Sequence, residues 1–363
     1  MSFAPVPELV AEISAGRMIV LVDDEDRENE GDLVMAAECV RPEDVNFMAR
    51  EARGLICLSL SQARCAKLGL GPMVVDNGSP YGTNFTVSIE AASGVTTGIS
   101  AHDRAHTIRT AVARDASPRD LTQPGHVFPL AAQPGGVLVR AGHTEAASDL
   151  AGMAGFEPAG VLVEILDEDG SMARRPQLER FARKHGLKIG SIEDLIRHRL
   201  AHERLVERVL ERDVTTDAGP FRLHVFRSLL DGTLHHALVR GEPATQPAPL
   251  VRVHVQDPLA DALGVHELGG GAVGPARALR EIALAGHGVL VVLAGADDRR
   301  DTVARLAGDG HAQHAGDWRR SGLGAQVLRA LGLARIRVLG APRRFPGLSG
   351  FGIEVVEYAA PHE

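Results

Sequence analysis

The chain has 363 residues, of which 44% are hydrophobic and 24% are charged, so it is long enough for two domains and too apolar to be disordered. Its formal net charge is −8, which argues against nucleic acid as a partner, because binding a phosphate backbone requires a strongly cationic surface. The longest apolar runs, such as 289–294, are far too short to cross a bilayer, so we expect a soluble protein without a membrane partner.

Three cysteines, Cys39, Cys57 and Cys65, lie in the first fifth of the chain. An odd number of clustered cysteines does not make a disulfide framework and is typical of a reducing compartment. We therefore expect the protein to be cytoplasmic.

Residues 1–205 read as alternating strands and helices. Apolar or alternating segments predict strands over 18–22, 33–40, 85–89, 136–140 and 159–166. Pro42 followed by two acids predicts the start of a helix, and Ser100 with Asp103 has the spacing of a capping box for a helix over 101–112. Two further helices are predicted over 174–186 and 192–210.

The segment 213–220 contains Asp, Gly and Pro, which favour turns and loops, and this composition predicts a domain boundary in the region. A second alternating set follows, with strands predicted in 221–230, 250–257, 288–295, 335–340 and 352–358 and helices near 275–285 and 323–332. The chain is therefore predicted to be an α+β protein with two domains.

The densest polar run, DDEDRENEGD, extends from Asp23 to Asp32 and lies directly between two predicted strands. Carboxylates so close together repel one another unless a cation or the polar groups of a substrate offset their charge, which favours a divalent metal site. A solvated acidic turn is the alternative interpretation.

A second polar run, from Arg140 to Glu145, follows an apolar segment and precedes a predicted helix. Arginine offers a fork for phosphate, glycine lets a ligand approach the backbone, and helix N-terminal amides complete an anion site. An ordinary strand-to-helix turn is the alternative. Two more candidates are His126, in a turn, and Glu164, inside an apolar strand where an acid is costly unless it is paired or functional.

Several long motifs occur in order along the chain: LVDDEDRENEGDLVMAAE, NFTVSIEA, GVTTGISAHDRAHTIR, PGHVFPLAAQPGGVLVRAGHTEAASDL and GVLVEILDEDG. In these motifs the chain resembles 3,4-dihydroxy-2-butanone 4-phosphate synthase, a riboflavin-pathway enzyme, over about residues 5–205. The resemblance implies a three-layer α-β-α fold and a homodimer with active sites near the subunit interface. It also implies conversion of ribulose 5-phosphate to 3,4-dihydroxy-2-butanone 4-phosphate and formate.

The same resemblance implies roles for individual residues. Glu28 and His143 would be the two protein ligands of Mg²⁺ or Mn²⁺, and such a sparse site suits a cation that keeps several waters. The implied substrate-binding positions are Arg27, Glu28, Asp32, Arg140, Ala141, Gly142, His143, Thr144 and Glu164. His126, Glu164 and Asp32 are the candidates for proton transfer, and the sequence does not assign a particular proton to each.

From about residue 206 the chain resembles GTP cyclohydrolase II, in FRLHVFRSLLDGTLHHALVRGE and in DWRRSGLGAQVLRALGLARIRVLG. That family's zinc site uses three cysteines, and no cysteine follows Cys65 in this chain. Asp257 stands in place of the first cysteine, and the glycines 269–271 replace the other two. Catalytic zinc needs three protein ligands, so we expect no zinc in this domain.

The family's phosphate and guanine segments are also replaced, over 294–298 and 339–342, although Asp317 and Arg319 keep its D-x-R pair. We therefore predict a three-layer synthase domain over 1–205 and a second α/β, cyclohydrolase-like domain over 206–363 that is catalytically silent on GTP. Two alternatives stay open. One is a bifunctional enzyme with an unusual zinc site built from Asp257, His254 or His266, and the other is a second domain that acts as a binding or assembly module.

Overall fold

The computed structural model describes residues 2–25, 27–79, 81–263, 273–294, 317–340 and 353–361. The chain divides into two compact units, Met1–His198 and Arg199–Glu363. The boundary predicted at 213–220 is wrong, because this segment holds the turn of a hairpin inside the second unit, between β8 (Val206–Thr216) and β9 (Gly219–Ser228). No helix within the described ranges is long and apolar enough to span a lipid bilayer.

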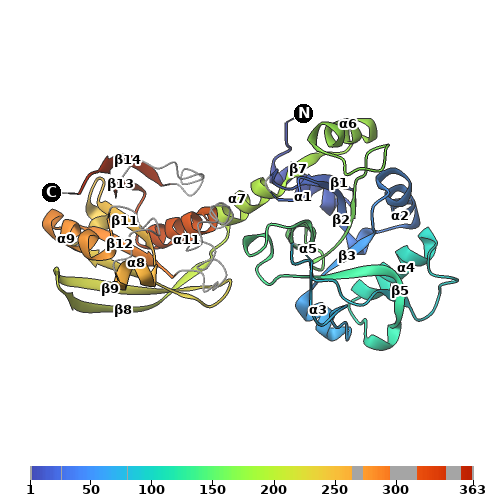
Figure 1. Ribbon diagram of the computed structural model, residues 1–363, viewed down its shortest axis with the longest axis horizontal. Coiled ribbons are helices and arrows are strands. Elements are labelled where there is room, and N and C mark those ends of the chain that lie inside the picture. Colours follow the sequence, from blue (N-terminus) through green and yellow to red (C-terminus); the bar gives the residue numbers. More distant parts are fainter. Residues whose placement is uncertain are drawn as a thin grey trace. The chain divides into compact units, whose positions relative to one another are not determined.

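The first unit is built around one mixed seven-stranded sheet (Figure 1). Its strands are β1 (Ile19–Val22), β2 (Gly31–Ala36), β3 (Cys57–Ser61), β4 (Ile89–Ala91), β5 (Leu121–Ala132), β6 (Ala159–Glu164) and β7 (Ile189–Ser191), in the order β4-β5-β3-β6-β2-β1-β7. β2 is antiparallel to both β1 and β6. The end of β1, the start of β2 and the end of β6 therefore meet at one end of the sheet.

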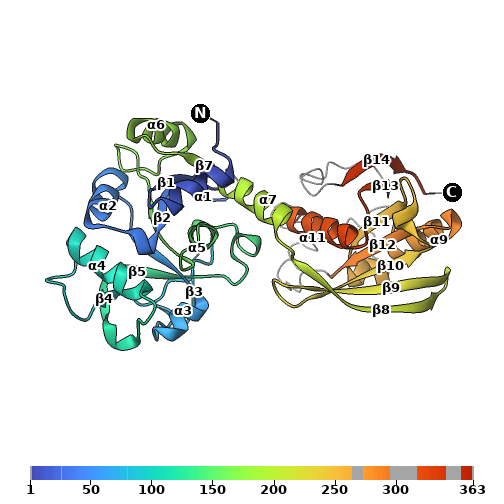
Figure 2. The ribbon, with the colours of Figure 1, turned by 180° about the vertical axis from the view of Figure 1, so that it is seen from behind.

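Helices cover both faces of this sheet, so the predicted three-layer arrangement is confirmed (Figures 1 and 2). One layer contains α1 (Val6–Ser14) and α5 (His143–Met153), and the other contains α2 (Pro42–Phe47), α4 (Ala101–Val112) and α6 (Arg175–His185). Along β1, Val20 and Val22 belong to the core shared with α2, α4 and α6, whereas Ile19 and Leu21 are buried on the opposite face. Strands buried on both faces read as continuous apolar runs.

Several predicted elements of this unit are present, and one predicted strand is wrong. The helix over 101–112 is α4, with Ser100 as its N-cap, and the helix over 174–186 is α6. Residues Gly136–Leu138 form a 3₁₀ turn in place of a strand. Gly136 has a positive φ of 62°, and a Cβ there would lie 2.1 Å from the Asp149 carboxylate, which accepts a hydrogen bond from the Val137 N–H.

Two predicted elements are shorter in the structure than in the sequence pattern. The strand predicted over 85–89 is reduced to β4 at Ile89–Ala91, with isolated bridges before it. The helix predicted over 192–210 ends at His202 as α7 (Ile192–His202), and the charged residues from Val206 onward form β8. Pairing of β8 with β9 overrides the helical pattern of this charged segment.

The second unit also contains a mixed seven-stranded sheet, in the order β14-β13-β11-β12-β10-β9-β8. Its remaining strands are β10 (Leu234–Arg240), β11 (Leu250–Val255), β12 (Gly288–Leu293), β13 (Arg335–Leu339) and β14 (Glu354–Ala359), and its helices include α8 (Pro258–Leu263), α9 (Pro275–Ala285) and α11 (Asp317–Ala330). Strands β8, β9, β10 and β12 are antiparallel, whereas β12, β11, β13 and β14 are parallel. The predicted α+β class with two domains is confirmed.

Candidate active site and metal centre

The acidic run forms the loop between β1 and β2, and the buried carboxylate of Asp23 holds this loop in shape. Asp23 Oδ1 accepts a hydrogen bond from the Glu30 N–H (2.8 Å), and Oδ2 accepts one from the Glu28 N–H (3.1 Å). The Arg27 guanidinium donates to the same Oδ2 (2.8 Å) and to Glu28 Oε1 (3.0 Å). The loop is therefore ordered around one carboxylate, unlike a solvated acidic turn.

Arg174, immediately before α6, fastens this loop to the body of the unit. Its Nη1 donates to the carbonyl oxygen of Glu28 (2.7 Å) and also to that of Asn29. Asn29 has a positive φ of 55°, so the backbone turns sharply at this point. The two contacts fix the backbone that carries the Glu28 side chain.

His143 is the first residue of α5 and is buried. Its Nε2 lies 3.2 Å from the carbonyl oxygen of Leu21 in β1. A carbonyl accepts hydrogen bonds and cannot donate them, so Nε2 carries the proton and Nδ1 presents its lone pair. Burial lowers the pKa of this imidazole, which favours its neutral, cation-binding form.

The free Nδ1 of His143 faces the acidic loop. It lies 4.0 Å from Glu28 Oε2, which is too far for a hydrogen bond. With a carboxylate oxygen of Asp23, these atoms lie within 4.8 Å of one another. An imidazole nitrogen with carboxylate oxygens is a donor set that suits Mg²⁺ or Mn²⁺. The structure thus brings the two predicted metal ligands together and adds Asp23 beside them.

Asp32 and Glu164 are directly opposite each other on the neighbouring strands β2 and β6. Glu164 Oε2 accepts a hydrogen bond from the Leu55 N–H (2.8 Å). Asp32 is 4% exposed, and its Oδ1 has no hydrogen-bond partner among the described residues. Burial, with the neighbouring charges of Glu164 and Glu28, raises the pKa of Asp32 well above its ordinary value. This carboxyl is therefore suited to hold a proton or to bind a polar group of a ligand.

The run from Arg140 to Thr144 leads into the N-terminus of α5. Gly142 is the N-cap, and the Arg140 guanidinium occupies the space beside it, because a Cβ there would lie 2.3 Å from Arg140 Nη1. Ser59 donates to the Thr144 carbonyl oxygen (2.6 Å), which ties this turn to β3, and Ala141 is half-buried next to it. The first-turn N–H groups of a helix lack intrahelical partners and favour an anion.

The sequence suggests that the Arg140 guanidinium is available to bind phosphate, but in the structure it is hydrogen-bonded to other groups of the protein. Its Nη1 donates to Glu145 (2.6 Å), and its Nη2 donates to Thr83 Oγ1 (3.0 Å) and to the Tyr81 carbonyl oxygen (3.1 Å). The Tyr81 hydroxyl in turn donates to the Arg27 carbonyl oxygen (3.0 Å). Arg140 therefore connects the turn before α5 with the acidic loop.

His126 lies on β5, with Nδ1 2.7 Å from Glu90 Oε2 and with 44% of its side chain exposed. In the registers of β5 and β6 with β3, Phe128 and Leu162 lie on either side of Cys57. Continuing each register by two residues sets His126 and Glu164 on either side of residue 55. His126 therefore reaches the same end of the sheet as the acidic cluster, with Glu90 as its contact.

Four residues that shape this site were not predicted from the sequence: Glu90, Glu145, Tyr81 and Arg174. Arg174 and Glu28 are 146 positions apart, so no local pattern connects them. Glu90 and Glu145 are buried acids within otherwise apolar or helical segments, and that is the signal which could have identified them.

The residues considered for an unusual zinc site make other contacts in the described part of the second unit. His254 Nε2 contacts both carboxylate oxygens of Asp261 (2.9 and 2.8 Å), and the Asp257 N–H donates to the same carboxylate (3.0 Å). His266, the glycines 269–271, residues 295–298 and 341–342, and the side chains of Asp317 and Arg319 lie outside what the structure describes.

Replacing Arg174 by Met removes both hydrogen bonds to the acidic loop, and we expect the affinity for Mn²⁺ to fall about tenfold, as for other residues that orient a metal ligand. Calorimetric titration of the purified protein measures this. The matched control is Arg175→Met, because Arg175 is a half-exposed neighbour that pairs with Glu179. Equal Mn²⁺ affinities for the two variants would contradict the role given to Arg174.

Asp32→Asn should stabilise the metal-free protein at neutral pH. Because the folded state raises the pKa of Asp32, its contribution to stability is complete below the unfolded value of about 3.9 and is lost as the pH rises. The asparagine side chain of the variant cannot ionise, so its contribution to the stability of the fold does not fall as the pH rises. Calorimetry in EDTA should therefore give a higher melting temperature for the variant at pH 8, with a smaller difference at pH 5. A less stable variant at pH 8 would refute this.

Two family models match the chain. Residues 7–198 match the model described as 3,4-dihydroxy-2-butanone 4-phosphate synthase, and residues 207–360 match the model described as GTP cyclohydrolase II. The two matches correspond to the two compact units of the structure.

A Pseudomonas aeruginosa (strain PAO1) protein named 3,4-dihydroxy-2-butanone 4-phosphate synthase is 52% identical over 363 residues, covering 99% of each chain. The crystal structure of RibBX, a two-domain 3,4-dihydroxy-2-butanone 4-phosphate synthase from A. baumannii, matches with a TM-score of 0.84 and 49% identity, covering 99% of this chain and 100% of that one. A synthase structure in complex with two magnesium ions matches at 44% identity and a TM-score of 0.53, covering 54% of this chain and 96% of that one. The chain therefore belongs to the 3,4-dihydroxy-2-butanone 4-phosphate synthase family.

Proposed function

We propose that this protein converts ribulose 5-phosphate to 3,4-dihydroxy-2-butanone 4-phosphate and formate, a step of riboflavin biosynthesis. The observation that carries the proposal is the convergence of Glu28 and His143 beside Asp32 and Glu164, which pair on neighbouring strands, in a chain of the synthase family. We assign the synthase domain to residues 1–205 and the second domain to residues 206–363.

Glu28 and His143 would hold one Mg²⁺ or Mn²⁺ ion. The donor set supports this assignment, because Nδ1 of His143 has a free lone pair and faces a carboxylate. When bound, such a cation polarises the ketone and hydroxyls of the sugar and stabilises negative charge that develops on their oxygens. Asp23 and Arg27 orient Glu28, and the Leu21 carbonyl orients His143, as outer groups do around metal ligands.

Asp32, Glu164 and His126 would move the protons. The sugar must be enolised, lose water, rearrange its carbon skeleton and release C4 as formate, so several proton transfers are needed. Burial and the neighbouring carboxylates raise the pKa of Asp32, which favours its protonated form. His126 is engaged at Nδ1 by Glu90, which leaves Nε2 as the atom that exchanges a proton.

The phosphate group would bind at the N-terminus of α5. Backbone N–H groups from Gly142 to Thr144 open the helix there, and the N–H groups of a first helical turn favour an anion. Arg140 positions this turn through Glu145 and Thr83 and adds positive charge beside it. Arg27 would complete the substrate contacts from the acidic loop.

We also propose a homodimer of the first unit. Large apolar side chains are exposed in the first unit, namely Leu55, Met73, Val74, Val75, Tyr81 and Ile99. Extended apolar surface is typical of a subunit interface. Leu55 and Tyr81 also hydrogen-bond to Glu164 and Arg27 through their own N–H and hydroxyl groups, so this interface would adjoin the site. The three free cysteines support a cytoplasmic location.

Glu28→Gln and His143→Ala should each lower turnover at least about 100-fold while the protein stays folded, because each removes a metal ligand. Formate release from ribulose 5-phosphate, followed by proton NMR with Mg²⁺, measures turnover. The control is Glu25→Gln, which removes an exposed charge from the same loop and should leave turnover unchanged. Normal turnover in either ligand variant would refute the metal assignment.

We propose further that the second unit neither holds zinc nor opens the ring of GTP. His254 is already paired with Asp261, and no cysteine follows Cys65 in the sequence. A catalytic zinc ion needs three protein ligands and an open position, and the described residues of this unit supply no such set. The absence of the family's three zinc-binding cysteines supports the proposal that the cyclohydrolase site of this unit is inactive.

The purified protein should contain far less than one zinc ion per chain and should release no formate from GTP in the presence of Zn²⁺. Metal analysis and the same NMR assay test both points, with ribulose 5-phosphate as the positive control. Formate from GTP would mean that an unusual zinc site exists. A rise in melting temperature with GTP, without formate, would instead favour a nucleotide-binding module.

A further inference from the structure

Among the residues that the structure describes, β8 forms an open edge of the second sheet. It is the last strand in the sheet order, has 11 residues, and has no strand on its outer side within the described ranges (Figures 1 and 2). From Arg208 to Asp213 its residues are exposed, including Val209 (39%) and Leu210 (47%) at its centre. A long strand with an open edge and central apolar residues is a template for pairing with another strand.

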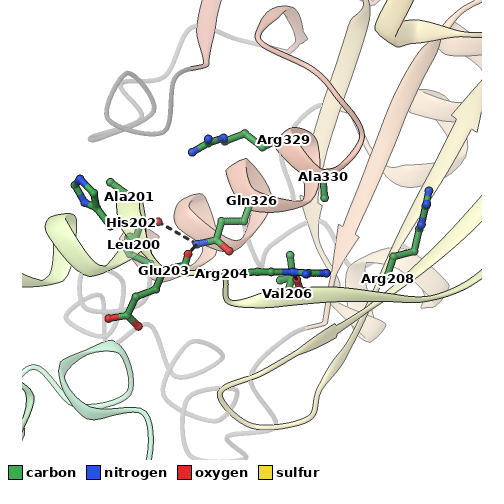
Figure 3. Close-up of a pocket in the computed structure, with 10 residues that line it drawn as sticks. All are labelled: Leu200, Ala201, His202, Glu203, Arg204, Val206, Arg208, Gln326, Arg329 and Ala330. Atoms are coloured by element: carbon green, nitrogen blue, oxygen red, sulfur yellow. Dashed lines mark hydrogen bonds between the residues drawn. The ribbon is translucent and has the colours of Figure 1, made fainter. Parts of the chain in front are cut away.

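The start of β8 is held rigidly, so the open edge is pre-formed. Gln326 of α11 accepts a hydrogen bond from the Leu205 N–H (2.7 Å) and donates to the carbonyl oxygens of Leu200 and Glu203 (3.0 and 2.7 Å). Figure 3 shows this amide beside a pocket of about 610 Å³, formed where α7 ends and β8 begins. A strand whose first residues are already held in place loses little conformational entropy when it pairs with another strand.

A bulge at Val209 sets which face each side chain of β8 occupies. Arg208 is opposite Phe226 of β9 and Leu210 is opposite Val225, so Val209 is the extra residue. Arg208 and Glu211 therefore share one face of the sheet, and their side chains form an ion pair at 3.0 Å. By the same register, Glu207, Leu210 and Arg212 share the other face.

We propose that β8 pairs antiparallel with β8 of a second copy of this chain and joins the two sheets across a two-fold axis between Val209 and Leu210. In this register Arg208 faces Glu211 of the second copy, and Glu207 faces Arg212. Val209 faces Leu210 at the centre. Each charged pair joins opposite charges on the same face, and the symmetry repeats each pair.

Neighbouring registers of the same two strands are unfavourable. A shift by one residue in either direction sets residues from different faces opposite each other, such as Arg208 with Arg212 or Glu207 with Glu211. Neither the Arg208–Glu211 pair nor the Glu207–Arg212 pair then forms, so these two complementary pairs favour the one register.

The test compares the mass of the full-length protein by light scattering over a range of concentrations, for wild type, Arg208→Glu and Glu211→Arg. Each variant sets like charges against each other across the proposed axis and within its own chain. A one-to-one mixture restores opposite charges between two different chains while each chain keeps its own like-charged pair. Rescue by mixing therefore reports pairing between copies and not repair of the ion pair within one chain.

The matched control is Arg335→Glu, which breaks an exposed ion pair with Glu354 on β13 and β14, away from β8. Formate release should be unchanged in all three variants, and circular dichroism spectra that match wild type would show that the second unit is folded. Because the first unit would form its own dimer, β8 would join two such dimers. We therefore expect a wild-type mass twice that of Arg208→Glu or Glu211→Arg at the same concentration, recovery in the mixture, and no change in the control. Equal masses for wild type and both variants, or a mixture that stays at the lower mass, would overturn the proposal.

Discussion

Repulsion among carboxylates crowded at one end of a sheet is the constraint on which the first unit depends. Asp23, Glu28, Glu30 and Glu164 all add to the rise in the pKa of Asp32, after its burial. Around Asp23 the repulsion is offset by two backbone N–H donors and by the Arg27 guanidinium. The remaining charge, at Glu28, faces the lone pair of His143, and a bound divalent cation would neutralise it.

The fold brings these groups together through contacts between distant segments. Because β1 pairs with β2 and β2 with β6, both antiparallel, the acidic loop, Asp32 and Glu164 lie at one end of the sheet. α5 then adds His143, which the Leu21 carbonyl fixes in one tautomer. The second unit keeps a comparable mixed sheet, but its histidine at 254 is paired with Asp261. In our account that unit has changed from catalysis to assembly.

The sequence was sufficient for the elements and motifs whose pattern is local. Continuous apolar strands, the cap at Ser100 and the acidic run between two strands could all be read directly. The sequence could not show that Arg140 binds Glu145 and Thr83, or that Arg174 holds the acidic loop, because these contacts join segments far apart in the chain. The charged segment after His202 continues the pattern predicted as helix over 192–210, whereas pairing with β9 makes it a strand from Val206 onward.

The central claim is that a divalent cation binds to Nδ1 of His143 beside Glu28. Electron spin echo measurements on the protein loaded with Mn²⁺ test it directly, because a histidine nitrogen bound to Mn²⁺ modulates the echo. The account predicts a histidine nitrogen coupling in the wild-type protein that shifts with ¹⁵N-histidine labelling and disappears in His143→Ala. Mn²⁺ bound without any histidine coupling, or with a coupling that persists in the variant, would contradict it.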